Sequence, residues 1–223
     1  MSTLTLADID RDDAIAEALD GLHGTTRAGF LRRAALGGAA LLAASAAPAG
    51  AAVGERDEAI LNYALTLEYV QDSFYSEVER LGSLSGKLAE QAHVVGAHER
   101  AHVVALRKVL GSRAVKRPRF DFRGATEDAD RFRKTAVAFE DLAVAAYKGQ
   151  APRITSRAYL ASALAIHSVE ARHAAWIRRL AGKPPVSGPF DAPLGRPAVT
   201  RIVDSTHFVM STTSAKKGPR FTG

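Results

Sequence analysis

One pattern of polar residues occurs twice in the chain at helical spacing, and this repetition constrains the fold more than any other feature. Each copy has a glutamate, a tyrosine seven residues later, a second glutamate about 30 residues after the first, and a histidine three residues beyond that. The residues are Glu68, Tyr75, Glu99 and His102 in the first copy and Glu140, Tyr147, Glu170 and His173 in the second. Unrelated segments would not agree at so many offsets, so we predict two copies of one helical hairpin, related by a pseudo-twofold axis.

Four segments after Ala51 carry apolar residues at the spacing of an α-helix. Their predicted bounds are 55–81, 86–110, 126–149 and 156–181. Short glycine-containing breaks join the members of each pair, whereas a longer connection over 112–125 separates the pairs. Short links give antiparallel hairpins and a long link can cross a bundle. We therefore predict an all-α, ferritin-like four-helix bundle with one long crossover between its second and third helices.

The repeated glutamates and histidines occupy helix positions where the apolar stripe is expected. In the second segment they fall in line with Val95 and Leu106, and in the fourth we expect Leu164 and Ile177 to flank them. In the first segment we expect the inner stripe to end at Leu81. The acidic side chains are therefore predicted to point into the bundle.

Burying four carboxylates together costs many kcal/mol unless they are protonated, paired or bound to cations. Two divalent ions would supply four positive charges, and residues three apart on a helix can aim at one centre. The chain has no cysteine, so any metal must use imidazole and carboxylate. We predict a carboxylate-bridged pair of metal ions held by Glu68, Glu99, His102, Glu140, Glu170 and His173.

The metal ligands are predicted to have distinct places. Glu99 and Glu170 are expected to bridge the two ions, and Glu68 and Glu140 to be terminal ligands. This donor chemistry favours iron, then manganese or a mixed iron–manganese pair, and it is compatible with zinc. A polar network in a bundle that has lost its metal is the competing interpretation.

Several runs of residues are typical of one known family. They are Leu67-Glu68-Tyr69, the run from Glu140 to Pro152, and the run from Glu170 to Ala175. On these residues the chain resembles, over about 57–194, the ferritin-like domain proteins related to plant desiccation-related proteins, many of which in bacteria carry Tat-type leaders. The resemblance implies the bundle and a di-metal site, but it does not specify a reaction.

The first 51 residues have the features of an export signal. Residues 34–47 form an apolar stretch of signal-peptide length, and cleavage is predicted after Ala51. The segment before it resembles a twin-arginine (Tat) signal, although Ala28 stands where the second arginine is expected and Arg32-Arg33 lies too late. We predict export by the Tat route to the periplasm, cell envelope or exterior. The Sec route, an uncleaved anchor and a buried Ala-rich helix are the alternatives.

These features favour an exported di-iron protein that binds Fe(II) and oxidises it with oxygen or peroxide. A non-catalytic stress or desiccation-related envelope protein is the alternative, and the sequence does not decide whether the chain is an enzyme. Residues 52–182 are predicted to form the bundle and 183–223 an irregular tail rich in proline and glycine. Without a short fifth helix in that tail, a mineral-storing cage is disfavoured.

The predicted partners are metal ions and oxygen or peroxide. The chain has a net charge of +6, but its basic residues are scattered, so nucleic acid is not expected as a partner. No stable membrane span is expected after cleavage of the signal, and a homo-oligomer is compatible with the sequence.

Other polar residues near the pattern have less certain roles. Tyr75 and Tyr147 are expected to pack in the core, and the alternatives are a hydrogen bond to a ligand or the transfer of an electron. Asp72, one turn after Glu68, could orient a ligand histidine through a hydrogen bond. His167 is expected in or beside the core. Two further histidines are expected at the surface or rim of the bundle: His93 and His98.

Overall fold

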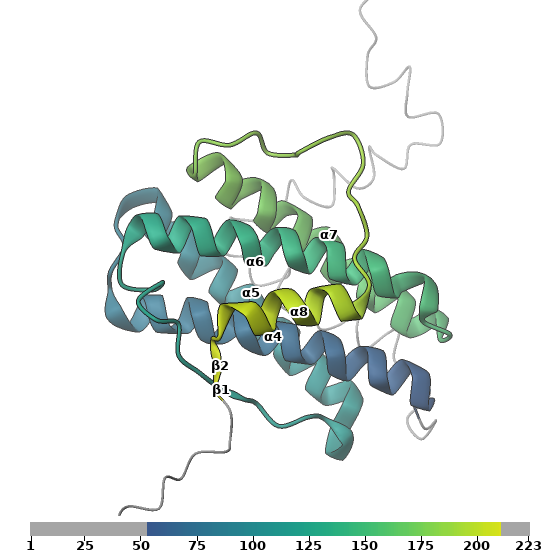
Figure 1. Ribbon diagram of the computed structural model, residues 1–223. Coiled ribbons are helices and arrows are strands. Elements are labelled where there is room, and N and C mark those ends of the chain that lie inside the picture. The colour runs from purple at the N-terminus through teal and green to yellow at the C-terminus, as the bar shows by residue number, and fades with distance from the viewer. Residues whose placement is uncertain (1–52, 211–223) are drawn as a thin grey trace, which may run out of the picture. The chain divides into compact units, whose positions relative to one another are not determined.

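The computed structural model describes residues 53–210, and helices dominate this part of the chain (Figure 1). The α-helices are α4 (Glu55–Leu81), α5 (Gly86–Leu110), α6 (Ala129–Gln150), α7 (Arg157–Leu180) and α8 (Arg196–Thr206). The shorter elements are the 3-10 helices η1 (Gly111–Arg113) and η2 (Ala151–Arg153) and the strands β1 (Arg119–Phe120) and β2 (Val209–Met210). The predicted export signal over 1–51 lies outside the described residues. Within 53–210, none of the helices combines the length and apolar composition needed to cross a membrane.

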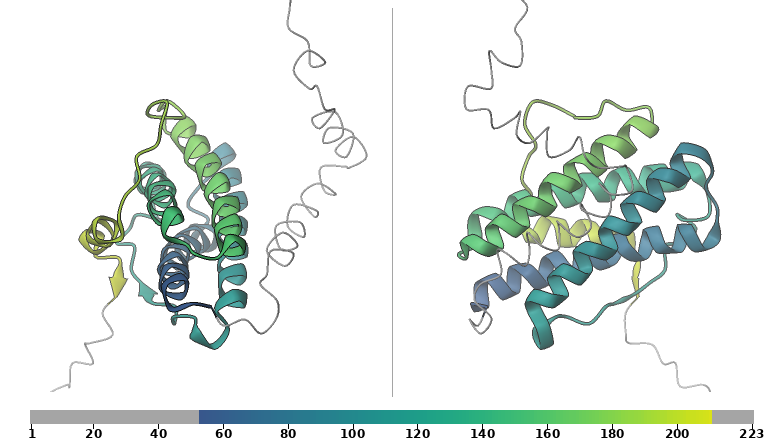
Figure 2. Two further views of the ribbon diagram at one scale, coloured as in Figure 1. Left: turned by 90° about the vertical axis from the view of Figure 1, so that its right-hand side faces the viewer. Right: turned by 180° about the vertical axis from the view of Figure 1, so that it is seen from behind.

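The four long helices form two hairpins, α4 with α5 and α6 with α7 (Figures 1 and 2). The most extensive contacts between elements lie within these two pairs. The segment between the hairpins runs along α4, where Val115 donates its backbone N–H to Asn62 and Thr126 donates its hydroxyl to Glu77. The prediction of an all-α bundle with one long crossover is therefore confirmed.

Capping residues explain where the third and fourth helices begin. The Asp128 side chain accepts hydrogen bonds from the backbone N–H groups of Asp130 and Arg131, so α6 begins at Ala129 rather than at the predicted 126. Ser156 caps α7 by accepting from the backbone N–H of Tyr159. The predicted helix bounds thus differ from the observed ones by at most three residues.

Two apolar clusters fill the bundle, with the polar residues of the repeat between them. One cluster contains Phe74 and Phe132, whose rings stack with centroids 5.2 Å apart. Along α5, Val95 belongs to this cluster and Val103 to the other, and Glu99 lies between them. The same alternation of apolar, acidic and apolar positions recurs along the other three helices, so the acids occupy the middle of the bundle.

Two predicted core residues face solvent instead. Leu164 is 49% exposed and Leu81 is 41% exposed. Leu164 precedes Glu170 by six residues, which at about 100° per residue places it on a different face of the helix. Ile166, four residues before Glu170, takes the buried position.

The segment after α7 is not irregular throughout, so that part of the prediction for 183–223 is wrong. It contains α8, which lies on the outside of the bundle (Figure 2), and β2, which pairs antiparallel with β1 of the crossover. Val199 of α8 is fully buried in a cluster with Tyr63 and Leu67 of α4 and Ala146 of α6. Proline is favoured in the first turn of a helix, so Pro197, the second residue of α8, is compatible with the helix.

A glycine in α6 lets the chain come back against the bundle. Leu194 donates its backbone N–H to the carbonyl of Ala145, and its own carbonyl oxygen lies 2.0 Å from where a Cβ atom on Gly149 would be. A larger residue at position 149 would therefore displace the segment that leads into α8.

Candidate metal centre

The structure brings all six residues of the predicted metal site together in the middle of the bundle. α4 and α6 each contribute one glutamate, and α5 and α7 each contribute a glutamate and a histidine. All six side chains are buried. They form two overlapping groups whose donor atoms lie within 4.8 Å of one another: Glu68, Glu99, His102 and Glu170 in one, and Glu99, Glu140, Glu170 and His173 in the other.

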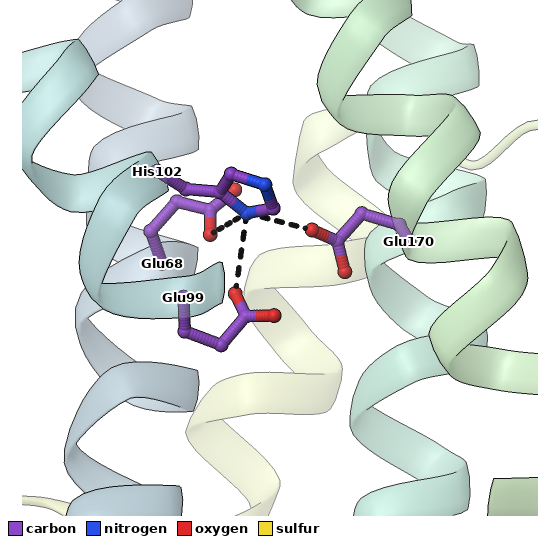
Figure 3. A group of neighbouring side chains, drawn as sticks. All are labelled: Glu68, Glu99, His102 and Glu170. Carbon is purple, nitrogen blue, oxygen red and sulfur yellow. Dashed lines mark hydrogen bonds and ion pairs between the residues drawn. The ribbon is translucent and has the colours of Figure 1, made fainter. Parts of the chain in front are cut away.

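The first group surrounds the Nδ1 atom of His102 (Figure 3). This nitrogen lies 3.3 Å from Glu68 Oε2, 3.5 Å from Glu99 Oε2 and 3.0 Å from Glu170 Oε1. The three acids come from three different helices, so the arrangement depends on the packing of the whole bundle.

The second group surrounds the Nδ1 atom of His173 in the same way. This nitrogen lies 3.0 Å from Glu99 Oε1, 3.5 Å from Glu140 Oε2 and 3.6 Å from Glu170 Oε2. Glu99 and Glu170 therefore each direct one carboxylate oxygen at His102 and the other at His173. Glu68 lies only beside His102, and Glu140 lies only beside His173.

Several oxygen and nitrogen atoms of the cluster have no hydrogen-bond partner within the described part of the chain in the observed geometry. Within residues 53–210, no hydrogen bond of normal geometry reaches either oxygen of Glu99, Oε2 of Glu140 or Oε1 of Glu170. Each histidine offers one nitrogen to three acids, and one N–H satisfies one acceptor. Buried polar atoms are normally satisfied, so this cluster of oxygen and nitrogen donors fits a pair of divalent cations.

The sequence model of the ferritin-like domain family matches residues 56–183, which is more than half of the chain. The chain belongs to the ferritin-like domain family. The matched region contains all four helices of the bundle and all six cluster residues. No curated protein matches the chain. The narrower relation to desiccation-related proteins stays a prediction.

Without metal, protons balance the charges of the six-residue cluster of this ferritin-like domain. Burial raises the pKa of Glu68 well above its usual value and that of Glu140 to about 8, so both terminal acids hold protons. Burial also opposes ionisation of Glu99 and Glu170, but the two imidazoles outweigh it and lower the pKa of both acids. The negative charges of Glu99 and Glu170 are then balanced by the positive charges of protonated His102 and His173, and the cluster is neutral.

His102 and His173, the two histidines of the cluster, hold protons because acids surround them. Burial disfavours their charged forms, but the neighbouring carboxylates outweigh burial. The pKa of His102 and that of His173 are therefore held well above the usual value by the acids of the cluster, including the ionised Glu99 and Glu170.

Two tyrosines hold the terminal acids from the opposite hairpin. Tyr75 of α4 donates a 2.5 Å hydrogen bond to Oε1 of Glu140 in α6, and Tyr147 of α6 donates one of 2.5 Å to Oε1 of Glu68 in α4. Burial and the nearby acids raise the pKa of both phenols well above the usual value, so they remain hydrogen donors. The tyrosines thus combine core packing with a hydrogen bond to a terminal acid.

Four other polar residues were assigned roles from the sequence, with mixed outcomes. Asp72 forms an ion pair with Arg117 of the crossover rather than orienting a histidine of the cluster. His93 lies at the surface beside Glu79, as expected. His167 is half-buried, and no group within residues 53–210 hydrogen-bonds to its Nε2 atom.

His98 lies closer to the cluster than expected for a surface residue. It is half-buried, and its Nδ1 atom lies 2.9 Å from Nε2 of His173. Gln71, which had no predicted role, donates from Nε2 to Oε2 of Glu170 at 3.4 Å. Gln71 lies one turn after Glu68, and this helical spacing is the signal that could have identified it.

Proposed function

We propose that this ferritin-like domain binds two divalent metal ions, most favourably iron, and oxidises Fe(II) with oxygen or peroxide. The observation that supports this is the sharing of Glu99 and Glu170 between the two histidines, one carboxylate oxygen to each. Such carboxylates can neutralise two cations at once. A pair of iron ions would supply the electrons that reduce oxygen or peroxide.

The residues of the chain would bind the ions and control their surroundings. Glu68 with His102 would hold one ion, Glu140 with His173 the other, and the two shared acids would join them. The hydrogen bonds from Tyr75 and Tyr147 leave Oε2 of each terminal acid directed at the histidine of its own end. The apolar clusters on both sides limit the access of water.

Manganese, or one iron and one manganese ion, is the second choice because imidazole and carboxylate ligands suit both metals.

We also propose that the protein is exported, by the Tat route, to the periplasm, envelope or exterior. The apolar stretch over 34–47 and the small residues around Ala51 support this proposal.

Elemental analysis of the purified protein tests metal binding, and the rate of Fe(II) oxidation under air or with peroxide tests the reaction. Glu99→Ala should reduce the metal content from two ions per chain to one or none and abolish oxidation. The matched control is Glu90→Ala, an exposed acid on the same helix, which should retain both. Circular dichroism checks that each variant is helical.

Two results would contradict the proposal. An unchanged metal content in Glu99→Ala would show that the cluster does not bind the ions. A protein that binds two ions but does not accelerate Fe(II) oxidation would instead favour the non-catalytic, stress-related role.

A further inference from the structure

The six cluster residues and the two tyrosines that contact them obey the internal repeat, but two other residues in contact with the cluster, His98 and Gln71, do not. Since Glu99 corresponds to Glu170 and His102 to His173, the counterpart of His98 is Val169. Since Glu68 corresponds to Glu140, the counterpart of Gln71 is Ala143. The two ends of the cluster therefore have the same donor atoms but different neighbours.

The His173 end has a hydrogen-bond partner for its imidazole. Nδ1 of His173 faces the acids, and Nε2 lies 2.9 Å from Nδ1 of His98 on α5. The two rings are nearly parallel, with 11° between their planes and 5.1 Å between their centroids. When Nδ1 of His173 binds a cation, Nε2 carries the hydrogen and donates it to His98. His98 thereby fixes both the tautomer and the orientation of His173.

The His102 end lacks this support. The corresponding position holds Val169, whose side chain cannot accept a hydrogen bond. Among the described residues, no group hydrogen-bonds to Nε2 of His102, and the side chain of His102 is 11% exposed against 4% for His173. His102 must therefore adopt the ligating tautomer without help from a protein group in this part of the chain.

The second difference also favours the His173 end. Gln71 donates to Oε2 of Glu170, which is the oxygen that faces His173. The counterpart Ala143 has no polar group that could steady an acid at the other end. One shared carboxylate is thus restrained on the side of His173.

We infer that the two metal positions are inequivalent, that the position at His173 binds its divalent ion more tightly and fills first, and that His98 is the positioning residue responsible. This inference rests on the proposed metal centre. Partners of ligand histidines typically contribute roughly 10–100-fold to metal affinity, which sets the size of the expected effect.

Anaerobic titration of the metal-free protein with Co²⁺ tests the inference, because visible absorption and calorimetry report each binding step. The unaltered protein should bind one equivalent more tightly than the second. His98→Val, which places the counterpart residue at position 98, should weaken the first step roughly 10–100-fold and leave the second unchanged. His98→Asn, whose Oδ1 can accept the same hydrogen bond, should restore much of the difference.

Val169→His is the matched reverse variant. It should strengthen binding at the His102 end and bring the two affinities together without changing the first step. The melting temperatures of the metal-free variants show whether any effect is merely structural, since a loss of stability alone would weaken both steps.

The results separate this inference from the proposed function. No binding of Co²⁺ to the unaltered protein would overturn both. Two equivalents bound with equal affinity by the unaltered protein would overturn the inequivalence and leave the metal centre standing. A His98→Val variant with an unchanged first step would overturn the role of His98. A variant in which both steps weaken equally would also overturn the role of His98 at one position.

Discussion

Tyr147 of α6 donates its hydroxyl hydrogen to Glu68 of α4, 79 positions earlier in the chain, across a distance of 2.5 Å. Tyr75 makes the reciprocal bond to Glu140. Each hairpin therefore restrains the terminal acid of the other, and neither hairpin alone can assemble a complete end of the cluster. The first prediction addresses this dependence directly.

Tyr147→Phe should destabilise the protein and weaken metal binding at the His102 end. The change leaves a buried oxygen of Glu68 without its donor, which typically costs about 1–3 kcal/mol of unfolding free energy. Urea denaturation and metal analysis measure the two effects.

Tyr159→Phe is the control, since Tyr159 belongs to the same apolar cluster but its hydroxyl makes no hydrogen bond within residues 53–210. Equal losses of metal in the two variants would show that packing, and not the hydrogen bond, matters.

Metal binding should release protons and strengthen as the pH rises. In the metal-free cluster Glu68, Glu140, His102 and His173 each hold a proton, because the pKa of each is raised. Two divalent ions would replace these four protons and leave the cluster neutral. We expect affinity to increase as the pH rises through about 8, the pKa of Glu140, because that acid must lose its proton to bind a cation. Calorimetry in buffers of different ionisation enthalpy counts the protons, and an affinity independent of pH would refute the expectation.

The metal-free protein should lose stability as the pH rises. The folded state raises the pKa of Glu140 from 4.5 to about 8, so its contribution is fully present below pH 4.5 and is lost as the pH approaches 8. The raised pKa values of the two histidines act in the same direction. Denaturation in a chelator at several pH values measures this dependence.

Glu140→Gln is the variant that isolates this effect. Its neutral amide can still accept from Tyr75, so the loss of stability with rising pH should be smaller than in the unaltered protein. An unchanged slope would mean that Glu140 is ionised in the folded state. The same variant should bind less metal at the His173 end.

Gly149→Ala should detach the segment that leads into α8. The new methyl group would meet the backbone carbonyl of Leu194. Moving Leu194 away would break the hydrogen bond that its backbone N–H donates to the carbonyl of Ala145. Overpacking of this kind typically costs about 1–3 kcal/mol. Limited proteolysis after α7 should become faster while two metal ions remain bound.

Gly188→Ala is the control for this experiment, because nothing lies within 4 Å of the added methyl group. If the two variants resist protease equally, the close approach at Gly149 does not hold the segment in place.

The sequence was sufficient to predict the features that depend on spacing along one helix. Residues three apart share a face, so Glu99 with His102 and Glu170 with His173 could be expected to converge once four amphipathic helices were recognised. The crossover followed from the length of the link between the hairpins. Leu164 was misplaced because six residues do not complete a whole number of turns.

Features that depend on contacts between distant segments could not be predicted in the same way. α8 is a short helix that buries a single residue fully, Val199. Its apolar residues Val199, Ile202 and Val203 do lie at helical spacing, but the prolines and glycines before them favoured an irregular segment. The role of His98 depends on its contact with His173 of α7. The reciprocal hydrogen bonds of Tyr75 and Tyr147 depend on how the two hairpins face each other. Local patterns carry no information about such pairings.

The neutrality of the metal-free cluster also affects when the protein can fold after its synthesis. Because the buried cluster is neutral before any ion binds, the chain can complete its core in surroundings that lack the metal. Folding and filling are then separate events that can happen at different times and places.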